Sequence, residues 1–262
     1  MAEQVSFPSS TGHRLAGLLD VPAGPVRGWG IFAHGFTLGK DSPAAARICK
    51  GLADEGIGML RFDNLGLGQS EGDWGDGSFT HKVDDTVLAA AFMAERGTPV
   101  ALLVGHSFGG AAVLAAAGRV PGLQAVVSVG APSEPRHVEH HYDALVDRVL
   151  ADGHAQWLVG GRALTLKRAF IEDVRTADVK SLVHRLSVPL LVMHSPTDST
   201  VSIDNASAIF KAAPHPRSFI SLEGSDHLLT ARGQARRAAR IISAWADQYL
   251  SAPERSAAPP GR

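Results

Sequence analysis

A serine between two glycines is the first candidate for chemistry. Residues 105–109 read Gly-His-Ser-Phe-Gly, between the apolar run 100–104 and an alanine-rich segment. This order predicts a buried strand, a sharp turn and a helix, with the Ser107 hydroxyl at the carboxyl end of a sheet. Such a hydroxyl suits a nucleophile, whereas a serine that only caps the helix is the simpler alternative. The rest of the chain has to decide between the two.

An aspartate and a histidine supply what such a serine needs. Asp198 follows the apolar run 190–193 and His227 follows the run 218–221, so both are expected, like Ser107, just beyond the ends of parallel strands. A serine hydroxyl is a weak nucleophile at neutral pH unless a histidine takes its proton and a carboxylate orients that histidine. Either residue alone is equally well a loop or turn residue. The order Ser, Asp, His on successive strand ends favours nucleophilic acyl chemistry.

Backbone N–H groups and further side chains complete the predicted site. The N–H groups of Phe36 and Phe108 are expected to form an oxyanion hole. Asp198 is preferred to Asp173 and Asp226 as the acid, because it alone follows a strand by a short loop. The residues expected to contact substrate are His34, His106, Trp157 and Leu164. Asp63 and His106 are interpreted as residues that fix turns.

Composition limits the classes of protein to consider. The chain has 262 residues, is 45% hydrophobic and carries a net charge of −1. It can bury a large core, and we expect one domain over residues 1–250, followed by a disordered tail over 251–262. No basic cluster predicts a nucleic-acid partner, and the single cysteine excludes an intrachain disulfide. Without a recognisable leader or an apolar run of membrane-spanning length, we expect a cytoplasmic protein with no membrane association.

Eight apolar or alternating runs predict strands. They are residues 5–7, 15–20, 29–33, 58–62, 100–104, 125–129, 190–193 and 218–221. The first two are joined by a polar turn and predict an antiparallel hairpin at a sheet edge. Helices are expected near residues 43–55 (capped by Ser42), 83–92, from 107 onward, 204–213 and 235–249. This alternation indicates an α/β fold with a parallel sheet and right-handed crossovers.

Residues 131–187 interrupt the alternation. They contain three histidines (137, 140 and 141), a hairpin over 157–166 with Gly-Gly at its tip, and a charged helical stretch near 167–183. We expect a cap that folds over the site and sets selectivity through its apolar side chains. The histidines lack a recognisable ligand spacing and are interpreted as a solvated polar segment, not a metal site. The glycines of residues 63–70 do not fit a dinucleotide loop, so no cofactor is expected.

Four motifs together resemble the α/β-hydrolase superfamily over residues 5–250. They are the segments 34–36 (His-Gly-Phe), 105–110 (Gly-His-Ser-Phe-Gly-Gly), 196–198 (Pro-Thr-Asp) and 225–227 (Ser-Asp-His). More closely, the chain resembles the hydrolase part of bacterial fusions with an osmotically inducible, peroxide-handling domain, which is missing here. The segment 34–37 and the compact cap also look like those of feruloyl and cinnamoyl esterases.

The resemblance implies a fold and an activity. The implied fold is an α/β-hydrolase fold with a mostly parallel eight-stranded sheet, helices on both faces and a small cap insertion. The implied activity is hydrolysis of small-molecule carboxylic esters through an acyl-serine, without cofactor or metal. Epoxide hydrolases and dehalogenases of the superfamily carry an aspartate where Ser107 stands, which argues against those activities. The alternatives are a thioesterase, a lipase-like or peptide-cleaving hydrolase, a perhydrolase, or a noncatalytic ligand receptor on the same fold.

Overall fold

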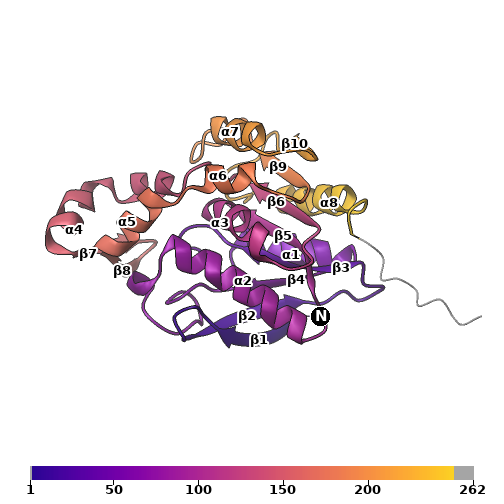
Figure 1. Ribbon diagram of the computed structural model, residues 1–262, viewed down its shortest axis with the longest axis horizontal. Helices are drawn as coiled ribbons and strands as arrows, with labels where there is room; N and C mark the ends of the chain where they lie inside the picture. Colours follow the sequence, from indigo (N-terminus) through magenta and orange to yellow (C-terminus); the bar gives the residue numbers. More distant parts are fainter. Residues whose placement is uncertain (1, 251–262) are drawn as a thin grey trace, which may run out of the picture.

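An eight-stranded sheet forms the centre of the molecule (Figure 1). The computed structural model describes residues 2–250; the predicted disordered tail, residues 251–262, lies outside the described residues. The strands in sheet order are β1 (Ala2–Pro8), β2 (Arg14–Asp20), β4 (Ile57–Phe62), β3 (Gly28–Ala33), β5 (Val100–His106), β6 (Ala125–Val129), β9 (Leu190–His194) and β10 (Arg217–Ser221). Strand β2 is antiparallel to β1 and β4, and every other pair is parallel. The predicted mostly parallel α/β sheet is confirmed.

Helices cover both faces of this sheet. The helices α1 (Pro43–Asp54) and α8 (Gln234–Ala246) share one apolar core. The other core holds α2 (Phe79–Glu95), α3 (Phe108–Ala116), α6 (Val179–His184) and α7 (Asp204–Ala212). Successive side chains of a strand point to opposite faces, so Leu102 and Val104 join the first core and Leu103 joins the second. Two covered faces explain the continuous apolar runs of the parallel strands.

The predicted cap extends from the carboxyl side of the sheet (Figure 1). It contains η3 (Pro135–His141), η4 (Asp143–Leu145), α4 (Val146–Asp152), β7 (His154–Val159), β8 (Arg162–Lys167) and α5 (Arg168–Thr176). The predicted hairpin is confirmed as β7 and β8, with Gly160 and Gly161 at φ of 55° and 76°. Both values are positive, as a two-residue hairpin turn of this twist requires, and glycine adopts them without steric cost.

Three local expectations differ from the structure. Ser42 occupies the N-cap of α1 but makes no side-chain cap bond, so only its carbonyl accepts a helical N–H. The predicted charged stretch after the hairpin is two helices, because the chain is extended at Ala177 and Asp178 then caps α6 through the N–H of Ser181. The last helix ends at Ala246, before the predicted residue 249.

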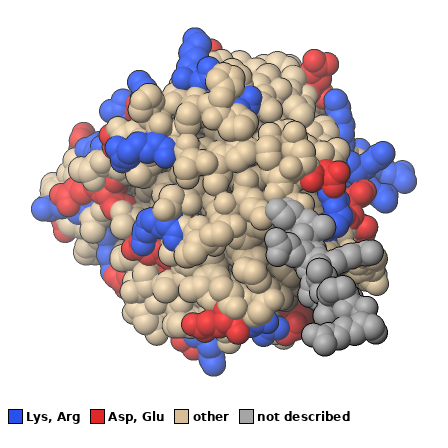
Figure 2. Space-filling model, turned by 45° about the vertical axis from the view of Figure 1, so that its right-hand side comes forward, with Lys and Arg blue, Asp and Glu red and all other residues tan. Residues whose placement is uncertain are grey.

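The remaining short elements are η1 (Trp74–Asp76) and η2 (Ala117–Arg119). Among residues 2–250, none of the helices combines the length and apolar character needed to cross a bilayer. Figure 2 shows acidic and basic side chains interspersed around the edge of one face, with other residue types filling most of its centre.

Candidate active site

Ser107 lies in a strained turn between β5 and α3. Its backbone has φ 54° and ψ −127°, a conformation that L-residues rarely adopt. Two glycines permit the turn: a Cβ on Gly105 would come within 2.3 Å of the Gly109 carbonyl oxygen, and one on Gly109 within 2.1 Å of the Ala33 carbonyl oxygen. Although Ser107 occupies the N-cap of α3, its side chain caps nothing. The helix-cap alternative is therefore wrong.

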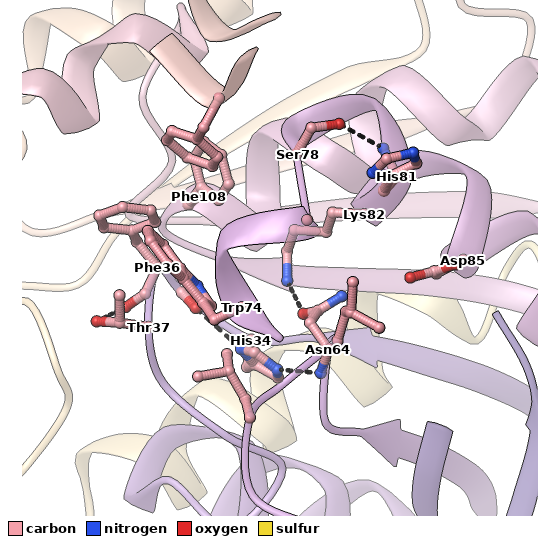
Figure 3. Close-up of a pocket in the computed structure, with 15 residues that line it drawn as sticks. His34, Phe36, Thr37, Asn64, Trp74, Ser78, His81, Lys82, Asp85 and Phe108 are labelled. Atoms are coloured by element: carbon pink, nitrogen blue, oxygen red, sulfur yellow. Dashed lines mark hydrogen bonds between the residues drawn. The ribbon is translucent and has the colours of Figure 1, made fainter. Parts of the chain in front are cut away.

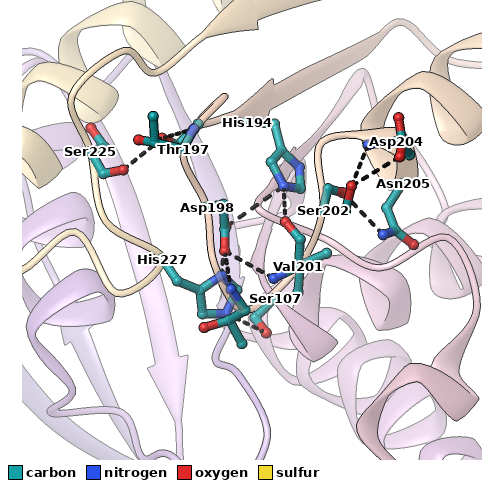
Figure 4. Close-up of polar contacts among 12 residues, drawn as sticks. Ser107, His194, Thr197, Asp198, Val201, Ser202, Asp204, Asn205, Ser225 and His227 are labelled. Atoms are coloured by element: carbon teal, nitrogen blue, oxygen red, sulfur yellow. Dashed lines mark hydrogen bonds and ion pairs between the residues drawn. The ribbon is translucent and has the colours of Figure 1, made fainter. Parts of the chain in front are cut away.

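The Ser107 hydroxyl instead faces the imidazole of His227, whose other ring nitrogen contacts the Asp198 carboxylate (Figure 4). The distance from Ser107 Oγ to His227 Nε2 is 3.0 Å, and that from His227 Nδ1 to Asp198 Oδ2 is 2.7 Å. The three residues follow β5, β9 and β10, so the sheet brings together side chains that are far apart in the sequence. With Nδ1–H donated to the carboxylate, Nε2 is free to accept the serine proton.

Backbone hydrogen bonds hold Asp198 ionised. Its Oδ1 accepts the N–H groups of Thr200 and Val201, both at 2.9 Å. Burial disfavours the charged form, but the hydrogen bonds from His227 and these N–H groups outweigh it and lower the pKa of Asp198. Asp173 binds Thr80 and Asp226 binds Thr230, so neither of those carboxylates is directed at the imidazole.

Sequence reasoning missed His194, which supports the loop carrying Asp198. This histidine is fully buried, and its Nε2–H donates to the Val201 carbonyl at 2.8 Å. Burial lowers the pKa of His194, which keeps it in the neutral form that this single bond requires. A second bond, from Ser195 Oγ to the Ser225 carbonyl at 2.6 Å, joins the loop to the one that carries His227. Only its place at the end of an apolar run could have singled out His194.

The two residues predicted to supply the oxyanion hole, Phe36 and Phe108, belong to segments that lie beside the serine. Phe108 is the first residue of α3, and Phe36 follows Gly35, whose position is so close that an added Cβ would lie 3.3 Å from Ser107 Cβ. In the described part of the chain neither N–H has a protein acceptor. The arrangement can therefore present two free donors beside the serine, as an oxyanion hole requires.

The two histidines predicted to contact substrate have different positions. His34 is buried and lines a small cavity; its Nδ1–H donates to the Gly35 carbonyl, and its Nε2 accepts the Asn64 N–H. His106 is also buried but is directed away from that cavity, and its Nε2–H donates to the His227 carbonyl at 2.7 Å. The substrate contact predicted for His106 is thus corrected to a positioning contact, because the ring binds the loop that carries His227.

The two cap residues predicted to contact substrate are also buried in the cap. Trp157 and Leu164 are cross-strand partners in the hairpin, each 8% exposed, and neither lines the cavity. The Trp157 ring stacks on Phe36 with centroids 5.6 Å apart and lies 5.9 Å from Trp74. Trp157 therefore packs against the Phe36 side chain and supports the segment that carries it. Leu158, also expected to offer apolar surface over the site, is 74% exposed.

The cap histidines do not form a uniformly solvated segment. His137 is half-buried, and its Nε2 donates to the Thr200 carbonyl at 3.0 Å, which links the cap to the loop of Asp198. The exposed His141 stacks on Phe36 with centroids 5.9 Å apart. The predicted turn-fixing role of Asp63 is confirmed: it accepts from Lys40 Nζ and from the backbone N–H of Lys40 and Gln69.

A family model described as "Serine aminopeptidase, S33" matches residues 24–175, more than half of the chain. The chain belongs to this family of α/β hydrolases. The hydrolase is 38% identical to an esterase domain from Rhodothermus marinus, with a TM-score of 0.77 over 96% of this chain and 100% of that one. A comparison with curated proteins found no match.

More distant structures share the fold of the hydrolase. Est1E from Butyrivibrio proteoclasticus, solved with ferulic acid bound, is 19% identical with a TM-score of 0.75 over 94% of this chain and 99% of that one. The α/β hydrolase GrgF from Penicillium sp. sh18 is 17% identical with a TM-score of 0.78 over 95% and 99%. The expected likeness to hydrolase domains of bacterial fusion proteins stays a prediction.

Proposed function

We propose that this hydrolase cleaves carboxylic esters of small to medium acyl or aromatic acids through an acyl-serine intermediate. The observation that carries the proposal is the unbroken contact from Ser107 Oγ through the His227 ring to Asp198 Oδ2. In that arrangement a hydroxyl can lose its proton as it attacks, and the resulting imidazolium lies next to an ionised carboxylate.

The proposed reaction has two halves. Ser107 Oγ attacks the ester carbonyl carbon while its proton passes to His227 Nε2, and the carbonyl oxygen becomes an anion held by the N–H groups of Phe36 and Phe108. The bond to the alcohol oxygen then breaks, and His227 returns the proton to that oxygen. In the second half, water gives a proton to His227 as its oxygen attacks the acyl carbon. The bond from that carbon to Ser107 Oγ then breaks, and His227 returns the proton to Oγ, which releases the acid and the free serine.

The relatives support esters as the substrate class. The Rhodothermus marinus relative is called an esterase domain, and its 38% identity extends over nearly the whole of this chain. The family description names serine aminopeptidases, which makes amide cleavage the second candidate. Amides have poorer leaving groups than esters, so an enzyme that cleaves peptides also hydrolyses activated esters, whereas the reverse does not hold.

Activated esters test the proposal directly. We expect turnover of p-nitrophenyl acetate and butyrate, and a loss on the order of 10⁶ in kcat for Ser107→Ala. Wild-type protein no faster than Ser107→Ala would contradict the enzyme proposal and favour a noncatalytic receptor. Amino-acid p-nitroanilides, assayed in parallel, separate the two enzyme candidates: we expect them to remain uncleaved, and rates matching those of the esters would replace the ester assignment.

A further inference from the structure

A buried lysine without a counter-ion lies in the cavity next to the proposed site (Figure 3). Lys82, on α2, is 6% exposed, and its Nζ donates to Asn64 Oδ1. Among the described residues no carboxylate lies within ion-pair distance of it. An ammonium group has three donors, so Nζ retains two of them for another partner.

A second buried lysine, Lys40, differs from Lys82 because it forms ion pairs. Lys40 is 4% exposed, and its Nζ lies 2.7 Å from Asp63 and 3.3 Å from Asp41. Lys82 has a carboxylate one turn away on its own helix, Asp85, which lines the same cavity. Its Oδ1 accepts the N–H and the hydroxyl of Ser10 at 2.7 and 2.8 Å, and it is not within ion-pair distance of Lys82. Unlike Lys40, Lys82 is therefore buried with no carboxylate of residues 2–250 within ion-pair distance.

Two other buried polar atoms in the wall of the cavity have no partner among the described residues. Asn64 Nδ2 and His81 Nδ1 are buried and have no hydrogen-bond partner. Burial lowers the pKa of Lys82 to about 7, with only a partial opposing effect from Asp85. Leaving such groups unpaired costs free energy in a folded protein, and an anion with two acceptor oxygens would satisfy them together.

The wall of this cavity lies beside the proposed reaction centre, although neither Ser107 nor His227 lines it. Its wall includes Gly35 and Phe36 on one segment and Phe108 on the next, which are the residues around Ser107. Trp74 and Phe170 add aromatic surface between that end and Lys82. The free volume is about 40 Å³, enough for a group of a few atoms at its polar end. One cavity wall thus joins the segments next to Ser107 to Lys82 through apolar, aromatic surface.

We propose that this cavity is an acyl subsite for chains that end in a carboxylate, with Lys82 and Asn64 Nδ2 as the donors to that carboxylate. The preferred substrates are then monoesters of short dicarboxylic acids. This inference rests on the proposed function and specifies the acyl group on which it acts. Lys82 determines specificity in this assignment and takes no part in proton transfer.

Matched esters test the subsite. Monomethyl glutarate and methyl pentanoate have acyl chains of equal length, and titration of released acid gives kcat/KM for each. We expect the wild type to prefer the glutarate ester, and Lys82→Met to lower the ratio of the two kcat/KM values at least tenfold. The control is Lys180→Met, an exposed lysine on α6, which should keep the wild-type ratio. A wild-type preference for the neutral ester or for methyl ferulate, or an unchanged ratio in Lys82→Met, would overturn the assignment.

Binding without turnover separates this inference from the proposed function. Calorimetry on Ser107→Ala should detect monomethyl glutarate, and the double variant with Lys82→Met should lose that binding. Detectable binding in an enzyme without esterase activity would contradict only the proposed function, whereas active enzyme with equal binding in both variants would contradict only the subsite. Asn64→Asp gives a second variant, which supplies Lys82 with an internal carboxylate and should lower the glutarate preference. A preference retained in that variant counts against the subsite.

Discussion

The ring of His106 and the backbone of His227 are joined by one hydrogen bond of 2.7 Å, from Nε2–H to the carbonyl oxygen. His106 immediately precedes Ser107, so this bond ties the sharp turn to the loop that supplies the proposed base. Burial, with a smaller effect from His227, lowers the pKa of His106 to about 4. The ring is therefore neutral at pH 7, and its single N–H, on Nε2, donates to the His227 carbonyl.

Removing that bond should slow turnover more than it affects binding. We expect His106→Phe to reduce kcat by about fivefold, because a net loss of about 1 kcal/mol frees the His227 loop to leave its reactive position. KM for p-nitrophenyl butyrate should change little. His106→Gln restores a donor and should recover part of the rate. Equal activity in His106→Phe and wild type, with both folded, would show that the loop is held by other contacts.

Asp198→Asn should preserve the shape of the site and remove most of its activity. The amide favours the histidine tautomer that cannot accept the serine proton, and the analogous change in a serine protease costs on the order of 10⁴ in kcat. The measurement is kcat for p-nitrophenyl acetate. Asp226→Asn is the matched control, since that carboxylate binds Thr230, and should stay within a few-fold of wild type. Near-normal turnover in Asp198→Asn would assign the acid to another residue.

The lowered pKa of Asp198 also predicts how stability depends on pH. A carboxyl whose pKa is lower in the folded state stabilises the protein above its unfolded pKa, and this contribution is lost as the pH falls through the folded value. The free energy of unfolding of wild type relative to Asp198→Asn should thus be greatest near neutral pH and decline below about pH 4. Urea unfolding of both proteins between neutral and acidic pH measures it. A difference independent of pH would show that the carboxylate is not preferentially ionised in the folded state.

Trp157→Ala should impair hydrolysis of short and bulky esters alike. The ring packs on Phe36, whose N–H is proposed to hold the oxyanion, so its removal leaves a cavity and loosens that segment. We expect a loss of about 3–5 kcal/mol in the free energy of unfolding. Leu158→Ala, at the exposed neighbouring position, should change stability by less than about 0.5 kcal/mol. A loss confined to bulky esters would instead restore the original expectation that Trp157 contacts substrate directly.

Gly109→Ala tests the turn itself. Its Cβ would overlap the Ala33 carbonyl, a backbone atom that cannot move without displacing β3. We expect a large drop in melting temperature and in kcat. Gly118→Ala places the same methyl group where no atom lies within 4 Å, and should leave both close to wild type. Circular dichroism melts and kcat measurements on the two variants make the comparison, and similar behaviour would mean that the turn tolerates a side chain.

Local patterns in the sequence predicted the frame of this protein. Strand–turn–helix order around Ser107, and apolar runs ahead of Asp198 and His227, depend on residues close in the chain, where periodicity and glycine sterics act. The same holds for the hairpin with glycines at residues 160–161, whose register follows from the turn. These features could therefore be found without knowing what any segment packs against.

Tertiary packing decided which side chains are available to a ligand. His106 and Trp157 looked like substrate contacts, yet the first is used by the His227 carbonyl and the second by Phe36. Nothing in the sequence singled out Lys82, but the fold buries it against Asn64. Whether a side chain is buried or has a counter-ion depends on segments distant in the sequence, so no local pattern predicts it. The residues proposed to react could be named from the chain alone. The chemistry of the cavity beside them arises only when α2, the loop after β4 and the cap pack together.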